Sequence, residues 1–433
     1  MIVTRRQFLG AAAVVGGTAA LASDPFSSRL PTASAATTTH STTTALPHPA
    51  ASGIDHIVVV MMENRSFDHF MGWLPGANGK QSGLTYVDRY GISHSTHHLT
   101  QPASCGHQDP DHSYEGGRIQ LNGGRADGWL RAGEDDLLPI GYYGQSDLAF
   151  LGQAAPRWTV CDQYFSAVMA ETYPNRFYMH SAQTDRLHNS TVTSTLPTIW
   201  DRLAGANLTG RYYFSDIPFV ALWGTKYESI AKPFATFLSD AAAGTLPEVS
   251  FIDPRFEDEA SGSSSDDHPH ADIRAGEQFL DEVYRAVTNG PGWARTLLVV
   301  NFDEWGGFFD HVAPTTAPDV SSTTALRGFR VPALVVSPRA RRGYVAHNTY
   351  DHTSVLKAIE WRWGLPSLSP RDAAARNLVE VLDFSRPADL TAPSFTLPPF
   401  VATACAPAPL SGPEQGEWPA LRDKAIADGW SLA

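Results

Sequence analysis

The chain has few cysteines, a deficit of positive charge, and apolar runs too short to cross a membrane. Three cysteines, Cys105, Cys161 and Cys405, allow at most one internal disulfide and match the spacing of no zinc module. The 45 acidic residues outnumber the 32 lysines and arginines, and the net charge of −13 argues against a nucleic-acid partner and general attraction to anionic membranes. Without internal repeats or a Pro/Gly-rich linker, the main part is expected to form a single domain, 53–433.

Residues 1–35 are typical of an export signal. Thr4 to Leu9, TRRQFL, matches the twin-arginine pattern, and Ala33 to Ala35 matches an A-x-A cleavage signal. An N-terminal anchor helix is the alternative for the apolar run between them. Residues 36–52 are Thr-rich and aperiodic, which predicts a disordered leader. These two patterns lead us to expect a protein that is secreted through the twin-arginine pathway and is extracellular or in the cell envelope. Proteins that use this pathway are exported already folded.

Two short apolar runs organise the rest of the chain. Residues 57–62 are continuously apolar and residues 296–302 are mostly apolar, which is typical of strands buried on both faces of a parallel sheet. The four residues that directly follow these runs are Glu63, Asn64, Asp303 and Glu304. Parallel strands end at one edge of a sheet, where α/β proteins bind ligands. Carboxylates that meet there repel each other unless a cation lies between them, and their oxygens suit a hard or borderline divalent metal.

Three further stretches carry candidate site residues. The Gly-rich stretch 105–129 predicts a loop, and its charged residues, His107, Asp109, Asp111 and His112, could bind metal or phosphate or simply be solvated. Thr172 stands at the start of a predicted helix, because Pro174 marks a corner there. Its hydroxyl is either a helix cap or a nucleophile favoured by the helix dipole. The acidic, Ser-rich stretch 257–270 predicts an exposed loop that ends in Asp-Asp-His-Pro-His.

The remaining periodicity predicts an α/β protein. Apolar runs predict further strands at 211–214, 249–252 and 331–337, and amphipathic patterns predict helices at 195–206, 271–288, 351–363 and 421–430. From about residue 385 the chain is Pro-rich, and we expect this extension to wrap the surface.

Five motifs in order resemble one known family. ENRSFDHFMG, DPDHSYEGG, ETYPNRFYMHSA, DDHPHAD and DEWGGFFDHV are similar to motifs of the bacterial phosphoesterase family that includes non-specific phospholipases C and related acid phosphatases. The resemblance covers residues 53 to 383 or so. It implies an alkaline phosphatase-like α/β fold, in which a mostly parallel central sheet has helices on both faces.

The resemblance also implies a set of site residues. The implied metal ligands are Glu63, Asn64, Thr172, Asp303 and Glu304. Thr172 is also the implied nucleophile, which would form a phosphothreonine. The implied catalytic or substrate-binding residues are His112, His268, His270, Arg176 and His311, although Arg176 could instead be the structural partner of an acid. The cofactor would be a divalent metal ion. The resemblance leaves open whether the metal is Ca, Zn, Mn or Fe and whether one ion or two are bound.

The expected function is that of a secreted metal-dependent phosphoesterase. Its substrate would be a phospholipid or a small phosphate ester, and the protein is expected to be a monomer. A basic lip formed by Arg339, Arg341 and Arg342 is compatible with transient contact with a membrane surface. An acid phosphatase acting on small phosphomonoesters is the alternative within this class, and a non-catalytic binding protein on an inactive scaffold is the alternative from another class.

Two features depart from the resembling family. Lipase-like members usually have His after the acidic pair, where this chain has Trp305. Larger members carry C-terminal β modules, for which the chain after residue 383 is too short. A sulfatase shares the implied fold but uses a modified Cys or Ser in a CxPxR-type sequence, where this chain has Thr172 in TYPNR.

Overall fold

The computed structural model of the protein describes residues 45–433, apart from 134–135, 259–260, 403, 406–415 and 433. The predicted export signal and residues 36–44 of the predicted leader lie outside the described residues. Residues 45–52 correct the predicted leader, because Leu46 packs against the core, Pro49–Ala51 form a short 3-10 helix and Ser52 is buried. The folded part therefore begins before residue 53. No helix in the described ranges is long and apolar enough to span a membrane.

Within the described residues, eight strands form one central sheet in the order β13-β6-β12-β11-β1-β10-β8-β9. Their bounds are β1 His56–Met62, β6 Thr159–Cys161, β8 Gly210–Phe214, β9 Ala231–Pro233, β10 Val249–Ile252, β11 Thr296–Phe302, β12 Ala333–Val336 and β13 Tyr344–Ala346. Strand β12 runs antiparallel to both of its neighbours, while every other pairing in the sheet is parallel. The mostly parallel sheet predicted from the sequence is confirmed.

Short strands outside this sheet form two-stranded pairs, β2 with β3, β4 with β5, and β7 with β14. Their bounds are β2 Thr85–Val87, β3 Ser93–Ser95, β4 His97–His98, β5 Gly141–Tyr142, β7 Tyr164–Phe165 and β14 Tyr350–Asp351. The α-helices are α1 Phe67–Met71, α2 Tyr114–Leu121, α3 Leu151–Ala154, α4 Thr172–Ser181, α5 Ile199–Gly205, α6 Phe234–Ala243, α7 Ile273–Asn289, α8 His352–Trp363, α9 Pro370–Ala374 and α10 Glu417–Asp428.

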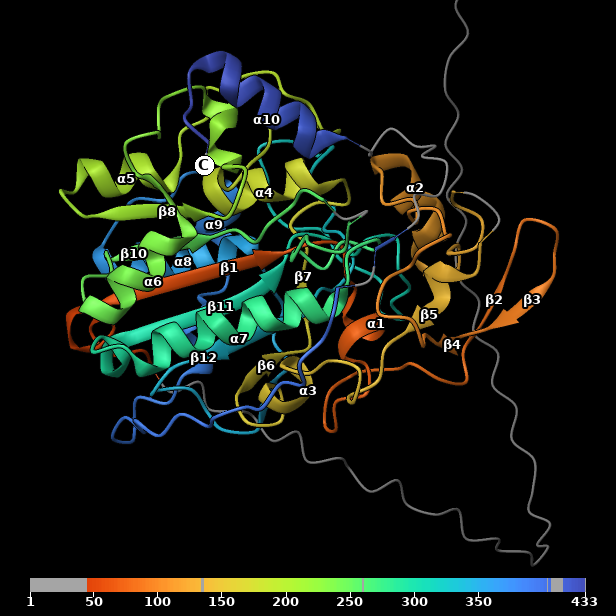
Figure 1. Cartoon of the computed structure of the whole chain (residues 1–433), viewed down its shortest axis with the longest axis horizontal. Helices are drawn as coiled ribbons and strands as arrows, with labels where there is room; N and C mark the ends of the chain where they lie inside the picture. Colours follow the sequence, from red (N-terminus) through yellow and green to blue (C-terminus); the bar gives the residue numbers. More distant parts are fainter. Residues whose placement is uncertain (1–44, 134–135, 259–260, 403, 406–415, 433) are drawn as a thin grey trace, which may run out of the picture. The chain divides into compact units, whose positions relative to one another are not determined.

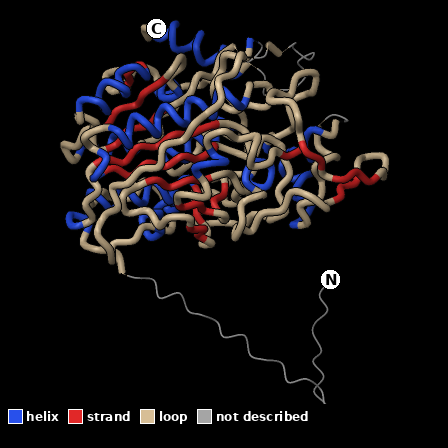
Figure 2. The backbone as a smooth tube through the Cα atoms, turned by 60° about the horizontal axis from the view of Figure 1, so that its bottom comes forward, coloured by secondary structure: helices blue, strands red, loops and turns tan. Residues whose placement is uncertain are grey.

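Helices cover both faces of the central sheet (Figures 1 and 2). Neighbouring residues of β8 show this directly, because side chains alternate between the faces of a strand. Tyr212 packs against Trp200 of α5, and Tyr213 packs against Phe237 of α6. Strands β1 and β11 lie in the middle of the sheet, and β11 is buried along its whole length. Coverage on both faces explains why these two strands are apolar without alternation.

Two predicted features of the loops are corrected. The stretch 105–129 contains helix α2, which begins after Ser113, whose hydroxyl accepts a hydrogen bond from Gly116 N at 2.9 Å. Its glycines concealed the helix, and Gly117 lies where a Cβ would meet Met169 and Trp305. The stretch 257–270 is not exposed throughout, because Asp266, Asp267 and His268 at its end are buried.

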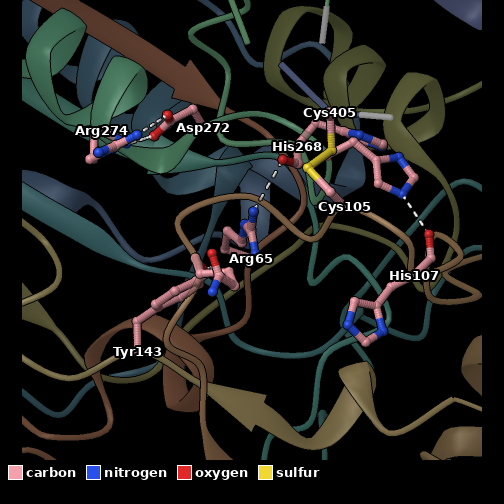
Figure 3. The surroundings of a disulfide bond; sticks show 10 residues. Arg65, Cys105, His107, Tyr143, His268, Asp272, Arg274 and Cys405 are labelled. Carbon is pink, nitrogen blue, oxygen red and sulfur yellow. Dashed lines mark hydrogen bonds and ion pairs between the residues drawn. A yellow bond between two sulfur atoms is a disulfide. The ribbon is translucent and has the colours of Figure 1, made fainter. Parts of the chain in front are cut away.

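One disulfide joins distant parts of the chain. Cys105 is bonded to Cys405, 300 positions later in the sequence, while Cys161 is a buried free thiol. Figure 3 shows the bridge beside His107 and His268. Residues 385–402 of the Pro-rich extension are exposed or half-buried except for Phe395, as predicted for a surface segment. Tyr284 of α7 donates a hydrogen bond to Pro393 O at 2.7 Å.

Candidate active site

The carboxyl ends of β1 and β11 bring four of the predicted residues together. The parallel register pairs Met62 with Phe302, so that Glu63 and Asp303 leave the sheet side by side. The Asn64 backbone N–H donates to Asp303 Oδ1 at 3.1 Å, and the Glu304 backbone N–H donates to the same oxygen at 2.7 Å. All four side chains are fully buried, which agrees with the juxtaposition predicted from the sequence.

The glycines after Glu304 let the two strand ends approach closely. Gly306 has a φ of +61°, and a Cβ there would lie 2.0 Å from the Asn64 carbonyl oxygen. Its backbone N–H donates to Glu304 Oε2 at 2.8 Å, which holds that carboxylate against the turn. Asn64 itself has a φ of +59°, a left-handed conformation that asparagine tolerates better than most residues. The sharp turns therefore fix the side chains at this edge.

Arg176 ties the acidic edge to helix α4. Its guanidinium lies 3.3 Å from Glu63 Oε1, 3.1 Å from Asp303 Oδ2 and 3.0 Å from Asp253 Oδ1. Asp253 directly follows β10, the strand on the other side of β1. The carboxyl ends of three neighbouring strands thus each supply one carboxylate to a single buried cation.

Burial and mutual repulsion govern the ionisation of these acids. Burial raises the pKa of Glu63 well above its ordinary value; Arg176 opposes this shift, and Asp303 adds to it. Burial likewise raises the pKa of Asp303, against the attraction of Arg176. Asp253 behaves in the same way, and burial raises its pKa to about 7. One guanidinium does not fully offset the cost of burying these carboxylates, so additional positive charge would favour their ionised forms.

Thr172 is the first residue of α4, and Glu171 occupies the N-cap position. Within the described part of the chain, the buried Thr172 Oγ1 has no hydrogen-bond partner. The cap alternative considered from the sequence therefore does not account for this hydroxyl. Residues four apart lie on the same face of a helix. Thr172 accordingly lies one turn from Arg176, towards the helix N-terminus.

Two predicted histidines lie close to the acidic edge. His112 Nε2 is 3.1 Å from Asn64 Nδ2 and 3.8 Å from Glu304 Oε1. His268 Nε2 is 3.1 Å from Asp109 Oδ2. Although burial alone would raise the pKa of Asp109, the neighbouring His268 and His112 imidazoles lower it. Asp109 therefore links the two histidines electrostatically.

The last segment of the 257–270 stretch is hydrogen bonded to the strand end. The Glu63 backbone N–H donates to Asp266 O at 2.8 Å, and Arg65 donates to His268 O at 3.1 Å, as Figure 3 shows. His270 is half-buried, and its Nε2 lies 3.0 Å from the His107 carbonyl oxygen. The structure thus brings His268 to the acidic edge, whereas the contact of His270 is with the 105–112 loop.

His311 belongs to a second cluster. Its Nδ1 contacts Asp68 Oδ2, and the ligand atoms of Asp68, Asp310 and His311 all lie within 4.8 Å of one another. Within this cluster the Arg330 guanidinium contacts Asp68 at 3.0 Å and Asp310 at 2.9 Å. Arg330 offsets part of the charge of these two acids, and burial still raises the pKa of Asp310 to about 6. The cluster is therefore a buried ion-pair network and also a second group of side chains that could hold a metal.

Trp305 is part of the core. It is fully buried, and its indole N–H donates to Gln120 Oε1 at 2.8 Å. It also packs against Phe329, with ring centroids 5.5 Å apart. At the position after Asp303 and Glu304, where His was expected from the family motif, the chain therefore has an aromatic ring that packs in the core.

Two residues at the edge were missed by the sequence analysis. Asp253 ends an apolar strand just as Asp303 does, and this signal could have identified it. Trp418 donates its indole N–H to Glu63 Oε2 at 3.1 Å, and the local sequence of α10 does not predict this long-range contact.

Comparison with known proteins identifies the family. The model of the Phosphoesterase family matches residues 54–366. The chain belongs to this family. It is 30% identical to non-hemolytic phospholipase C of Pseudomonas aeruginosa, covering 78% of this chain but only 58% of that protein. It is 29% identical to phospholipase C A of Mycobacterium tuberculosis, covering 85% of each, and 31% identical to non-specific phospholipase C6 of Arabidopsis thaliana, covering 77% and 73%.

The resemblance inferred from the five motifs is confirmed by these matches, and the family consists of phosphoester hydrolases. Solved structures with a related arrangement include a protein in the alkaline phosphatase superfamily from Vibrio parahaemolyticus, with a TM-score of 0.38, 8% identity and coverage of 75% and 70%. Another is the lipoteichoic acid synthase from Listeria monocytogenes, with a TM-score of 0.42, 6% identity and coverage of 88% and 93%.

Proposed function

We propose that the chain is a secreted, metal-dependent phosphoesterase of the phospholipase C type, with Thr172 as its nucleophile. The observation that carries this proposal is the buried Thr172 hydroxyl without a partner, at the N-terminus of α4 and one turn from Arg176. Arg176 in turn contacts Glu63 and Asp303. The N-terminus of a helix favours negative charge, which develops on the nucleophile and on the phosphate during transfer.

The residues at the edge fit a divalent cation. Besides Thr172 Oγ1, Asn64 Oδ1 is buried without a hydrogen-bond partner among the described residues, and burial and the nearby Asp303 raise the pKa of Glu63, a shift that a cation would reverse. The oxygen donors that would hold the cation are those of Glu63, Asn64, Thr172, Asp303 and Glu304. Such a set suits a hard or borderline divalent metal. When bound, the metal would supply positive charge that lowers the pKa of the Thr172 hydroxyl and stabilises phosphate oxygens.

The chain's own residues then account for two-step transfer. Thr172 Oγ attacks phosphorus in line, the bond to the leaving alcohol breaks, and a phosphothreonine forms. His112 and His268 hold the phosphate oxygens, and one of them donates a proton to the leaving alcohol oxygen. In a phosphodiester substrate this intermediate still carries the head group on its phosphorus. Water then attacks that phosphorus, the bond to Thr172 Oγ breaks, and the phosphorylated head group leaves while one proton of the water restores the Thr172 hydroxyl. Asp109 orients the His268 imidazole through their contact at 3.1 Å, and its negative charge lies close to both histidines.

The names of the relatives, which are phospholipases C, support a phospholipid as the substrate. We expect phosphodiester lipids to be hydrolysed to a diacylglycerol and a phosphorylated head group. The test is an activity panel of phosphatidylcholine, sphingomyelin and a small phosphomonoester, run on chelated protein and again after stepwise addition of Ca²⁺, Mn²⁺ or Zn²⁺. Activity on the phosphomonoester alone would favour the acid phosphatase alternative, and full activity in chelated protein would contradict the metal requirement.

A matched pair of variants locates the metal. Asp303 and Asp310 are both buried acids paired with a buried arginine, but they belong to different clusters. We expect Asp303→Asn to lose cation binding and activity, whereas Asp310→Asn retains cation binding, measured by calorimetric titration. The reverse result would assign the metal to the cluster with His311.

Export is the second part of the proposal. The motif at Arg5 and Arg6 favours a twin-arginine route. Changing both to lysine should leave the precursor in the cytoplasm, as measured by fractionation and blotting. Normal export of the double lysine variant would contradict this assignment.

A further inference from the structure

Helix α10 contributes a side chain to the acidic edge. Trp418, its second residue, donates its indole N–H to Glu63 Oε2 at 3.1 Å. Both side chains are buried, with relative exposures of 4% and 0%. The other oxygen of the same carboxylate, Oε1, lies 3.3 Å from Arg176. Two donors from separate elements therefore fix the two oxygens of Glu63.

The indole ring is itself held tightly. It stacks on Phe256 with ring centroids 3.5 Å apart and an interplanar angle of 4°. It also meets Tyr173 edge to face at 5.6 Å, and the Tyr173 hydroxyl donates to Glu417 O at 2.6 Å. Tyr173 follows Thr172 in α4, so the start of α10 is docked on the helix that carries the proposed nucleophile. The ring has little freedom to move its N–H away from Glu63.

The source of this contact is unusual. The matched family region ends at residue 366, and Trp418 lies well beyond it. By contrast, Arg176, which contacts the other oxygen of the Glu63 carboxylate, lies within that region. A segment outside the family region thus supplies a direct partner of a proposed metal ligand.

We propose that Trp418 is a positioning residue for Glu63, whose indole N–H fixes the carboxylate plane so that the remaining lone pairs face a divalent cation. This inference rests on the proposed function. Groups that hydrogen bond to metal ligands orient them, and losing one typically lowers metal affinity by about 10- to 100-fold. The C-terminal helix therefore helps to build the metal site.

The test compares two tryptophans of the same segment. Trp418→Phe keeps an aromatic ring on Phe256 but removes the N–H. Trp430→Phe removes an equivalent indole hydrogen bond, made to Gly224 O at 3.1 Å. Affinities for Ca²⁺, Mn²⁺ and Zn²⁺ are measured by calorimetric titration of chelated protein, and thermal unfolding of the metal-free variants reports whether each is folded. Trp418→Tyr, which also lacks the indole N–H, is the second variant should Trp418→Phe not fold.

We expect Trp418→Phe to bind the cation about 10- to 100-fold more weakly and Trp430→Phe to bind within about twofold of wild type. Raising the cation concentration should restore kcat in Trp418→Phe, which a general loss of structure would not allow. Wild-type affinity in the folded Trp418 variants, or an equal loss in Trp430→Phe, would overturn the inference alone. Absence of cation binding in the wild type, or unchanged binding in Asp303→Asn, would instead overturn the proposed metal site and this inference with it.

Discussion

At the scale of single residues, the Thr172 hydroxyl is one of several buried polar groups that nothing in the described fold satisfies, and it lies at the N-terminus of α4. A buried polar group without a partner costs about 1–3 kcal/mol. Its neighbour Asn175 is treated very differently, since its side-chain amide hydrogen bonds to the backbone of Val168, Ala170 and Glu171. This contrast within one helical turn agrees with the proposed role of the Thr172 hydroxyl as the nucleophile, whereas the Asn175 amide shapes the corner.

Replacing Thr172 separates the chemical role from the structural one. Thr172→Val keeps the shape and removes the hydroxyl, so we expect turnover to fall by at least about 1000-fold. The free energy of unfolding should stay the same or rise, because an unsatisfied hydroxyl is replaced by a methyl group. Thr172→Ser should retain measurable activity, since serine can still attack phosphorus. Near-normal turnover in Thr172→Val would mean that water attacks phosphorus directly.

At the scale of elements, the sequence predicted best those features that depend on neighbours along the chain. The strands at 249–252 and 296–302 match the structure at both ends, because each is a continuous buried run. Helix α2 was missed because Gly116 and Gly117 lower helix propensity, although close packing requires them. The direction of β12 was not predictable either, since the local sequence of a strand does not encode its orientation.

The same distinction holds for the site. Glu63 and Asp303 were found because each ends a buried strand, and the parallel register then places them together. Arg176 was recognised as a candidate, but its contacts with acids from three strand ends depend on how α4 docks. The contact of Trp418 with Glu63 spans most of the chain. Such contacts are set by tertiary packing, which no local pattern records.

The buried Glu277 of helix α7 is expected to make the free energy of unfolding depend on pH. Glu277 is fully buried, and its Oε2 accepts hydrogen bonds from the backbone N–H groups of Phe150 and Leu151. Burial nevertheless raises its pKa to about 8. A carboxyl whose pKa is higher in the folded state than in the unfolded state binds its proton more tightly when folded. It therefore stabilises the fold at low pH, and this stabilisation is lost as the pH rises from about 4.5 to about 8.

We therefore expect the wild-type free energy of unfolding to decrease between pH 5 and pH 8, and Glu277→Gln to weaken this dependence by at least about 1 kcal/mol. The amide oxygen can still accept both backbone hydrogen bonds. Urea unfolding across this pH range is the measurement. Glu282→Gln, an exposed position on the same helix, is the control and should leave the pH dependence unchanged. An identical slope in wild type and Glu277→Gln would refute the assignment.

At the scale of the whole molecule, the C-terminal segment is attached at several separate places. Cys405 is bonded to Cys105, close to the loop that carries Asp109 and His112. Further along, Trp418 contacts Glu63, and Arg422 forms an ion pair with Glu257. The segment thus joins the loops of the site to the end of β1, and its attachment affects both stability and the site.

The disulfide should contribute substantially to stability. Removing a native disulfide typically costs about 2–5 kcal/mol. We expect the Cys105→Ser/Cys405→Ser double variant to lose an amount in this range, measured by urea unfolding, and to bind the cation more weakly than wild type. Dithiothreitol should lower the stability of the wild type and leave the double variant unchanged, because the buried Cys161 is not bridged. Equal stability of oxidised wild type and double variant would contradict this expectation.

The Cys105–Cys405 bridge also implies an order of events in the making of the protein. Cys405 is synthesised 300 positions after Cys105, and the cytoplasm keeps thiols reduced. On the proposed export route, the chain folds before it crosses the membrane, so helix α10 must find its place on the domain without covalent help. Oxidation outside the cytoplasm then closes the bridge around an arrangement that already exists. Maturation would accordingly have two stages. The chain folds with reduced cysteines in the cytoplasm, and disulfide formation after export then stabilises the folded protein.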